Sequence, residues 1–170
     1  MIIRQENPRE FQEIYDLVKV AFQTAKVSDG NEQDYVNILR ASSKYIPELA
    51  LVAEADGRIV GHIMLTKTYI SRDDSKFEAL LLAPLSVALE YRNRGVGSKL
   101  VQESFRLAKK MGYRAVFVVG DPAYYARFGF KSIALFGIKH DPPIPDPYVM
   151  AYELPPGALF GVTGTCNFYL

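Results

Sequence analysis

Of all segments in the sequence, a basic turn that contains two glycines has the residue types that most clearly suit a chemical function. It reads Arg92-Asn93-Arg94-Gly95-Val96-Gly97-Ser98 and joins an apolar run to a helical pattern. Amides at a helix N-terminus have no partner within the helix and carry partial positive charge. Glycine lets an anion approach such amides closely. The backbone from Arg94 to Ser98 can therefore hold a pyrophosphate, to which Arg92 and Arg94 add charge.

Other interpretations of this turn are a plain connection with solvated arginines or a different nucleotide loop. A dinucleotide fingerprint of the Rossmann type would need a glycine where Arg92 stands, and it would need an acidic residue after the next strand. Asp121 could imitate that acid, but its place before Pro122 is explained more simply as a helix cap. A Walker loop is excluded because the chain has no Gly-Lys-Ser/Thr triplet.

A second segment, GDPAYYARFGF, brings a pair of phenols into a short predicted helix. Asp121 and Pro122 are typical of a helix start, and Gly129 ends a helix predicted over 122–128. Neighbouring helix positions point about 100° apart, so only one of Tyr124 and Tyr125 is expected to face a given site. Such a phenol can act as a proton donor; its structural alternative is a buried aromatic residue whose hydroxyl is hydrogen-bonded.

Composition limits the class of protein. The chain has 170 residues, of which 49% are hydrophobic and 23% charged, and its net charge is +1. These values favour a single domain over 1–170 and argue against a dedicated nucleic-acid binder. Cys166 is the only cysteine, and the two histidines, His62 and His140, lie far apart, so no metal site is predicted. We expect a cytoplasmic protein without a membrane span, because no apolar stretch is long enough.

A helical pair followed by an antiparallel meander is predicted for the first half. Hydrophobic residues recur at helical spacing after Pro8, up to about Lys26. Asp56-Gly57 is a strong hairpin signal, and Gly61 indicates a bulge or a close approach of another element. The remaining predicted elements here are a strand over 2–4, a helix over 32–41, strands over 49–55, 58–70 and 76–87, and a turn over 71–74.

The second half alternates helices and strands. A helix is predicted over 95–111 and a fully buried strand over 115–119, because the latter is an almost continuous apolar run. A proline-rich loop with Pro142, Pro143, Pro145 and Pro147 follows the Tyr-rich helix. A last strand is predicted over 148–154, and 157–170 mixes apolar and turn residues.

Taken together, these residues resemble the GNAT superfamily of acetyl-CoA-dependent N-acetyltransferases. The family signature is Arg or Gln, two residues, Gly, one residue, then Gly or Ala, and it is matched by Arg92, Gly95 and Gly97. The strand Leu85-Ser86-Val87 resembles the family strand that pairs with pantetheine. The segment 125–130, YARFGF, matches the family's Tyr, three residues, Gly-Phe element.

The resemblance implies an α/β (α+β) fold: a mixed, mostly antiparallel sheet flanked by helices, with a splayed parallel strand pair that admits acetyl-CoA. It implies Tyr125 as general acid and a homodimer as the family's habit. The acceptor implied is a primary amine of a small molecule or peptide. The implied contacts to acetyl-CoA come from Leu85, Ser86, Val87, Arg92, Arg94, Gly95, Val96, Gly97 and Ser98.

The chain departs from the family where some relatives carry a glutamate base, because that position is Leu81 here. A second departure is Leu89, where relatives often have proline. His62 follows a glycine on a strand that can border the acceptor site, but no base is assigned. A non-catalytic acyl-CoA-binding module and a purely structural domain remain the alternative functions.

Overall fold

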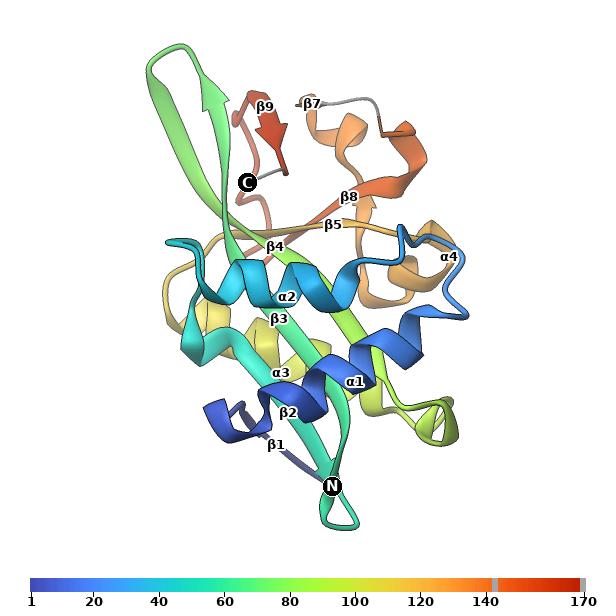
Figure 1. Cartoon of the computed structure of the whole chain (residues 1–170). Coiled ribbons are helices and arrows are strands. Elements are labelled where there is room, and N and C mark those ends of the chain that lie inside the picture. Colours follow the sequence, from blue (N-terminus) through green and yellow to red (C-terminus); the bar gives the residue numbers. More distant parts are fainter. Residues whose placement is uncertain (142–143, 169–170) are drawn as a thin grey trace. The chain divides into compact units, whose positions relative to one another are not determined.

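The computed structural model describes residues 1–141 and 144–168, and the strands within this part form one mixed sheet (Figure 1). Neighbouring strands follow the order β1-β2-β3-β4-β5-β8-β6, and β9 pairs with both β3 and β7. Pairing is parallel between β4 and β5 and between β7 and β9. The strands are β1 Ile2–Gln5, β2 Ala50–Ala55, β3 Arg58–Arg72, β4 Ser75–Val87, β5 Ala115–Val119, β6 Lys131–Ser132, β7 Ile138–Asp141, β8 Val149–Glu153 and β9 Gly164–Asn167. The predicted mixed sheet is therefore confirmed.

Two compact units share the long strands β3 and β4. The first contains Met1–Thr66 and Ala83–Leu107, and the second contains Lys67–Leu82 and Ala108–Leu170. The basic turn belongs to the first unit, and Tyr125 belongs to the second. The prediction of a single domain stays a prediction.

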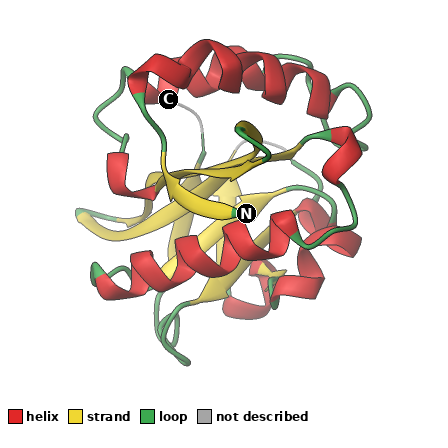
Figure 2. Cartoon of the chain, turned by 90° about the horizontal axis from the view of Figure 1, so that it is seen from below, coloured by secondary structure: helices red, strands yellow, loops and turns green. Residues whose placement is uncertain are grey.

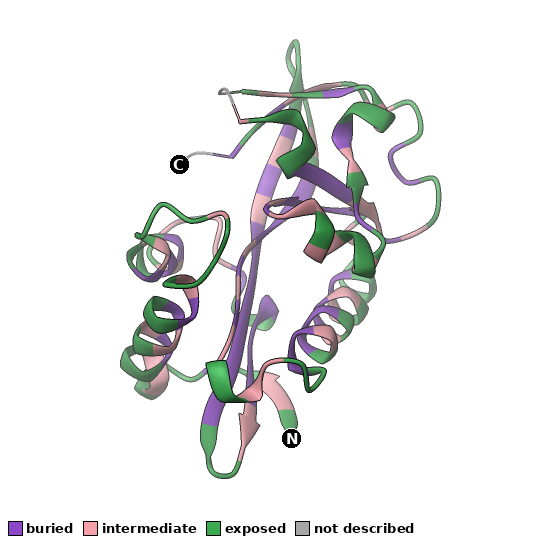
Figure 3. Cartoon of the chain, turned by 90° about the vertical axis from the view of Figure 1, so that its right-hand side faces the viewer, coloured by how far each residue is buried: buried purple, intermediate pink, exposed green. Residues whose placement is uncertain are grey.

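In the first unit, helices cover both faces of the strands (Figure 2). Helices α1, Phe11–Phe22, and α2, Glu32–Arg40, bury apolar side chains against Val52 and Met64. Helix α3, Val96–Lys110, packs on the other face at Gly61. The strands are mostly buried and the outward sides of these helices are exposed, as Figure 3 shows. This arrangement follows from helices with one apolar stripe each.

Local sequence signals account for several element boundaries. Asn7 caps a short 3-10 turn, Pro8–Glu10, in a capping box with Glu10, and α1 follows it directly. The helix ends at Phe22, four residues before the predicted end. Asp56 and Gly57 both have positive φ, 52° and 74°, as a two-residue hairpin turn of type I′ requires. The predicted hairpin between β2 and β3 is confirmed.

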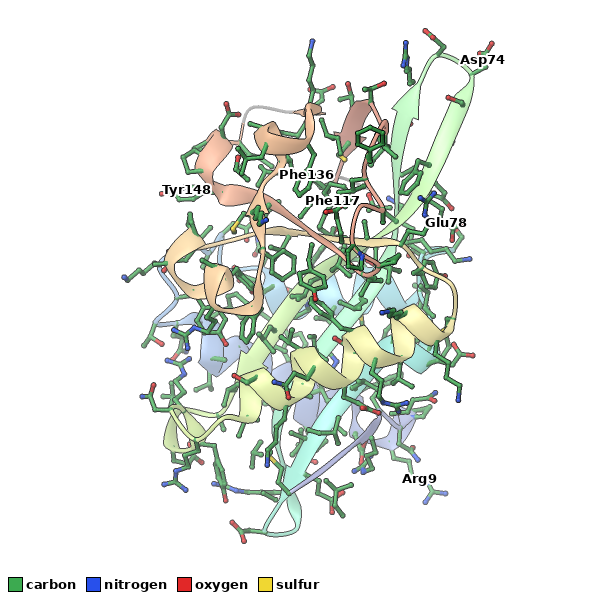
Figure 4. The ribbon with its side chains drawn as sticks, turned by 180° about the vertical axis from the view of Figure 1, so that it is seen from behind. Arg9, Asp74, Glu78, Phe117, Phe136 and Tyr148 are labelled. Atoms are coloured by element: carbon green, nitrogen blue, oxygen red, sulfur yellow. The ribbon has the colours of Figure 1, made fainter. Side chains whose placement is uncertain are left out.

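In the second unit, β5 is buried from Ala115 to Val118 and lies between two paired strands. It pairs in parallel with β4 at Leu80–Leu82 and antiparallel with β8 along all five residues. Phe117 at its centre is fully buried and lies among the strands, whereas Asp74 lies at the tip of the hairpin formed by β3 and β4 (Figure 4). The predicted parallel pair is confirmed, and its splaying stays a prediction.

Three short strands, β6, β7 and β9, were not predicted. β9 pairs antiparallel with β3 at Ile70 and Ser71, and β7 pairs in parallel with β9. These strands have two to four residues and no clear alternation, so only their partners stabilise them. The predicted proline-rich loop includes Pro142 and Pro143, which lie outside the described residues.

A buried ion pair joins three elements of the first unit. Glu6, just after β1, accepts from Arg40 at 2.9 and 2.8 Å, from the Tyr45 hydroxyl at 2.8 Å, and lies 2.9 Å from His62 Nε2. The side chains of Glu6, Arg40 and His62 are 1%, 7% and 0% exposed. Burial alone would raise the pKa of Glu6, but the hydrogen bonds from Arg40 and His62 outweigh it and lower this pKa to about 2.

Burial also lowers the pKa of His62. The ring is therefore neutral at pH 7, and its Nε2–H donates to the Glu6 carboxylate. The hydrogen bonds to the Glu6 carboxylate compensate a buried charge that would otherwise be isolated.

These two pKa shifts predict a stability that falls in two steps as the pH is lowered. Both groups have a lower pKa when folded, so the unfolded chain takes up their protons first, from about pH 6.5 for His62 and about pH 4.5 for Glu6. The Glu6 shift corresponds to about 3 kcal/mol, of which about 2 kcal/mol is lost by pH 3. Urea unfolding between pH 7 and pH 3 measures this. His62→Gln should remove the first step and keep the second, and a stability that is flat over this range would contradict the prediction.

Candidate functional site

The basic turn has the backbone conformation that its glycines and asparagine suggest. A 3-10 turn, Leu89–Tyr91, leads from β4 into it. Asn93 and Gly95 then adopt positive φ, 61° and 80°, which asparagine and glycine tolerate best. The chain thereby reverses and enters α3 at Val96.

The N-terminus of α3 presents backbone amides that have no partner within the helix. The amide of Lys99 donates to the Gly95 carbonyl at 3.0 Å, so Val96, Gly97 and Ser98 come before the hydrogen-bond ladder. Gly95 is exposed, and a Cβ atom placed on it would meet nothing within 4 Å. The turn therefore offers open space beside several donors, as an anion site requires.

Close packing at Gly61 holds α3 against the sheet. A Cβ atom at Gly61 would lie 2.9 Å from Val96 Cγ1 and Leu100 Cδ1. Only glycine allows the first two turns of α3 to come this near to β3. The predicted close approach at Gly61 is confirmed, and a register shift between β2 and β3 at Ala53 and Glu54 adds the predicted bulge.

The two arginines of the turn differ in their contacts. The Arg92 guanidinium donates to the Ala21 carbonyl and to Thr24 Oγ1, both at 2.8 Å. It therefore ties the turn to the C-terminal end of α1, where a cation suits the helix dipole. Arg94 is exposed, with its guanidinium 5.2 Å from the centre of the Tyr91 ring. Direct contact of either arginine with a cofactor stays a prediction.

The segment Leu85, Ser86 and Val87 forms the end of β4 beside β3. Ala88 N donates to the Val60 carbonyl at 2.8 Å, which fixes the two strands against each other. Ser86 is buried, and its Oγ has no hydrogen-bond partner among the described residues. Leu85 and Val87 are half-buried. Their backbone role at a cofactor stays a prediction.

Tyr125 lies on α4, Pro122–Tyr125, whose first turn is capped by the Asp121 side chain. Its ring packs so closely on Gly120 that a Cβ atom there would lie 2.5 Å from Tyr125 Cε2. Phe130 packs edge-on against it at 5.7 Å between ring centres. No described residue hydrogen-bonds the Tyr125 hydroxyl, and burial raises the pKa of Tyr125, with a smaller effect from Tyr124. The phenol therefore stays protonated and able to donate.

Tyr124 differs from its neighbour, because the Arg127 guanidinium lies 4.4 Å from the centre of its ring.

The buried Leu81 takes the position at which a glutamate base would stand. The sequence prediction did not include the contacts of Glu6 with His62 and Arg40. No spacing signal could have found them, since Glu6 lies 34 residues from Arg40 and 56 from His62.

No helix within residues 1–141 and 144–168 has both the length and the apolar character needed to cross a membrane.

In the comparison with known proteins, the family profile and the similar proteins agree on one family. The acetyltransferase (GNAT) domain profile matches residues 2–133. YhbS of Escherichia coli K12, named an uncharacterized N-acetyltransferase, is 32% identical over 170 residues, or 99% of this chain and 96% of its own. YjhQ of the same strain, also named an uncharacterized N-acetyltransferase, is 36% identical over 118 residues, or 68% of this chain and 64% of its own.

Solved structures agree with these relatives. The crystal structure of E. coli YhbS in complex with CoA has a TM-score of 0.88 and 29% identity, and the match covers 99% of this chain and 89% of that one. A GNAT family acetyltransferase from Brucella melitensis in complex with acetyl-CoA has a TM-score of 0.77 and 28% identity, with 99% and 95% covered.

The contacts of the two arginines predict different effects on stability. Arg92→Ala should lower the free energy of unfolding by about 1–3 kcal/mol, because two hydrogen bonds to the end of α1 are lost. Arg94→Ala, the matched control, should change it by less than about 0.5 kcal/mol. Thr24→Val should have an intermediate effect. Urea unfolding at pH 7 measures all three, and equal effects of the two arginine variants would show that the tether is unimportant.

Proposed function

The chain belongs to the GNAT acetyltransferase family, and on that premise we propose that it transfers the acetyl group of acetyl-CoA to a primary amine of a small molecule or peptide. The observation that carries the proposal is the turn before α3. Amides with no partner in the helix, a Gly95 in left-handed conformation and open space at its Cβ suit a pyrophosphate.

Several weak contacts can together hold the cosubstrate at this turn. Each contact of an anion with a helix N-terminus contributes about 0.3–1 kcal/mol when exposed, and up to about 2 kcal/mol when partly buried. Gly97 and Val96 are buried, whereas Gly95 is exposed, so the amide donors of the turn include both buried and exposed residues. In this proposal the amides from Arg94 to Ser98 bind the diphosphate. The backbone of Leu85 to Val87 pairs with pantetheine.

The reaction needs a neutral amine and a stabilised leaving group. The amine nitrogen attacks the thioester carbonyl carbon, and the C–S bond breaks with its electron pair on sulfur. We propose Tyr125 as the proton donor to that thiolate. With reference pKa values of about 10 for tyrosine and about 8.5 for a thiol, full transfer is uphill by about 2 kcal/mol. Burial raises the pKa of Tyr125 further, so the phenol stays protonated until negative charge develops on the sulfur, which it then hydrogen-bonds and protonates.

The acceptor amine must lose a proton before it attacks. At pH 7 this costs about 1.4 kcal/mol for an amine with a pKa near 8 and about 4.6 kcal/mol for a lysine near 10.4. A lysine acceptor therefore needs more assistance than an α-amine. A cytoplasmic location and a homodimer stay predictions.

The experiment that tests the function combines binding and turnover. Calorimetry with acetyl-CoA should give binding, and a panel of primary amines should give release of the CoA thiol in a colorimetric assay. Absence of binding at millimolar acetyl-CoA would leave only a structural role. Binding without thiol release from any amine would instead favour the non-catalytic acyl-CoA-binding module.

A charge placed at Gly95 should abolish binding of acetyl-CoA. Gly95→Asp puts a carboxylate into the open space beside the α3 amides, whereas Gly95→Asn has the same shape and a similar tolerance of positive φ. We expect the Asp variant to bind at least about 100-fold more weakly than the Asn variant, because like charges oppose the phosphate. Calorimetry compares the two, and equal affinities would place the diphosphate elsewhere.

Tyr125→Phe should lower kcat by about 10²-fold or more while the Kd for acetyl-CoA changes little, because general acid catalysis contributes about 10²–10⁴-fold. Tyr124→Phe is the matched control and should keep kcat within about threefold of the wild type. Thiol release at saturating substrates gives both values. A larger loss in the Tyr124 variant would assign the acid to the other phenol.

A further inference from the structure

His62 has one ring nitrogen without a partner. Its Nε2 donates to the Glu6 carboxylate at 2.9 Å, and its side chain is fully buried. Its Nδ1 has no hydrogen-bond partner among the described residues. Because Nε2 carries the proton in the neutral ring, Nδ1 has a free lone pair. A buried acceptor without a hydrogen bond is unfavourable, so a partner for this atom is expected in the working protein.

His62 lies on β3, one strand away from the segment of β4 proposed to hold the thioester. The Ala88 amide donates to the Val60 carbonyl, and a Cβ atom placed on Gly61 would lie 3.3 Å from the Ser86 carbonyl oxygen, so the end of β4 runs beside β3 next to His62. Glu6 lies on the side of β3 toward β1, and β4 is the neighbour on the other side. The two ring nitrogens diverge, so Nδ1 points away from Glu6.

The surroundings of His62 keep its ring neutral, because burial lowers the pKa of His62 and the Glu6 carboxylate only partly offsets this effect. Glu6 orients the ring, and Glu6 is itself held by both Nε and Nη2 of Arg40 and by the Tyr45 hydroxyl. The side chains that α1 and α2 pack against the sheet include the apolar Ile14, Val36 and Leu39, and Glu13 of α1 accepts a hydrogen bond from the Ile59 amide. A carboxylate bonded to one imidazole nitrogen fixes the tautomer and stabilises the imidazolium that forms when the other nitrogen takes a proton.

We propose that His62 is the general base of the acetyl transfer, with Glu6 as the residue that positions it. The inference rests on the proposed function. As the amine lone pair forms the C–N bond, the proton leaves nitrogen for His62 Nδ1, directly or through one water molecule. The C–S bond breaks, the thiolate keeps the electron pair, and the imidazolium returns its proton to solvent. His62 thus provides the base that Leu81 does not.

His62→Gln tests the proposal, because the glutamine amide can still donate to Glu6 but has no basic nitrogen. The measurement is thiol release from acetyl-CoA with the amine of the panel that reacts fastest in the wild type. We expect kcat to fall by about 10²-fold or more while the Kd for acetyl-CoA stays within about threefold. The matched control His140→Gln changes the other histidine, which contacts Asp146 in the second unit, and should react like the wild type.

The outcomes separate the two proposals. If His62→Gln turns over as fast as the wild type, this inference is overturned and the proposed acetyltransferase function still stands. A wild type that releases no thiol with any amine would overturn the proposed function and this inference with it.

A spectroscopic measurement decides the case in which His62→Gln does not fold. The chain has two histidines, so His140→Gln leaves a single imidazole for ¹⁵N NMR. We expect a neutral ring at pH 7–8, protonated at Nε2, with an Nδ1 signal that shifts when the reactive amine is added with CoA. A proton on Nδ1 at this pH, or an Nδ1 signal that does not shift when the amine is added, would overturn the proposal.

Discussion

The structure depends on the first turn of α3, where a helix must leave its first amides without partners. In most helices a side-chain cap or solvent satisfies these donors. Here a glycine in left-handed conformation clears the space in front of them, and a second glycine, Gly61 on β3, lets the helix sit close to the sheet. The same close contact that packs Val96 and Leu100 therefore also determines where the donors point.

The first unit combines this turn with a buried ionic network, and the two features serve different ends. The turn keeps its donors open, whereas Glu6, Arg40 and His62 satisfy one another in the interior. Replacing a buried ion pair with apolar residues often stabilises a protein, so stability alone is a weak reason to keep one. The network ends on His62, whose second ring nitrogen has no hydrogen-bond partner among the described residues, and the proposed orienting role of Glu6 would account for this.

Contacts within the second unit give Tyr125 and Tyr124 different surroundings although they are adjacent in sequence. Tyr125 packs on Gly120 and Phe130, and its hydroxyl has no partner among the described residues. Tyr124 instead lies under Arg127. Although the two residues are adjacent on a short helix, Tyr125 is a protonated phenol among apolar groups, whereas the ring of Tyr124 contacts a cation.

The sequence by itself determined the elements with strong local signals. The apolar run of β5, the hairpin at Asp56-Gly57, the start of the Tyr-rich helix and the glycine turn before α3 all lie where they were predicted, because nearby residues alone set these conformations. Family resemblance added the parallel pairing of β4 with β5. Only the tertiary structure decided the short strands β7 and β9, the tether from Arg92 to α1 and the contacts of Glu6 with His62 and Arg40. These features join residues 26 to 96 positions apart, and no local pattern encodes which partner a buried polar group meets after the chain has folded.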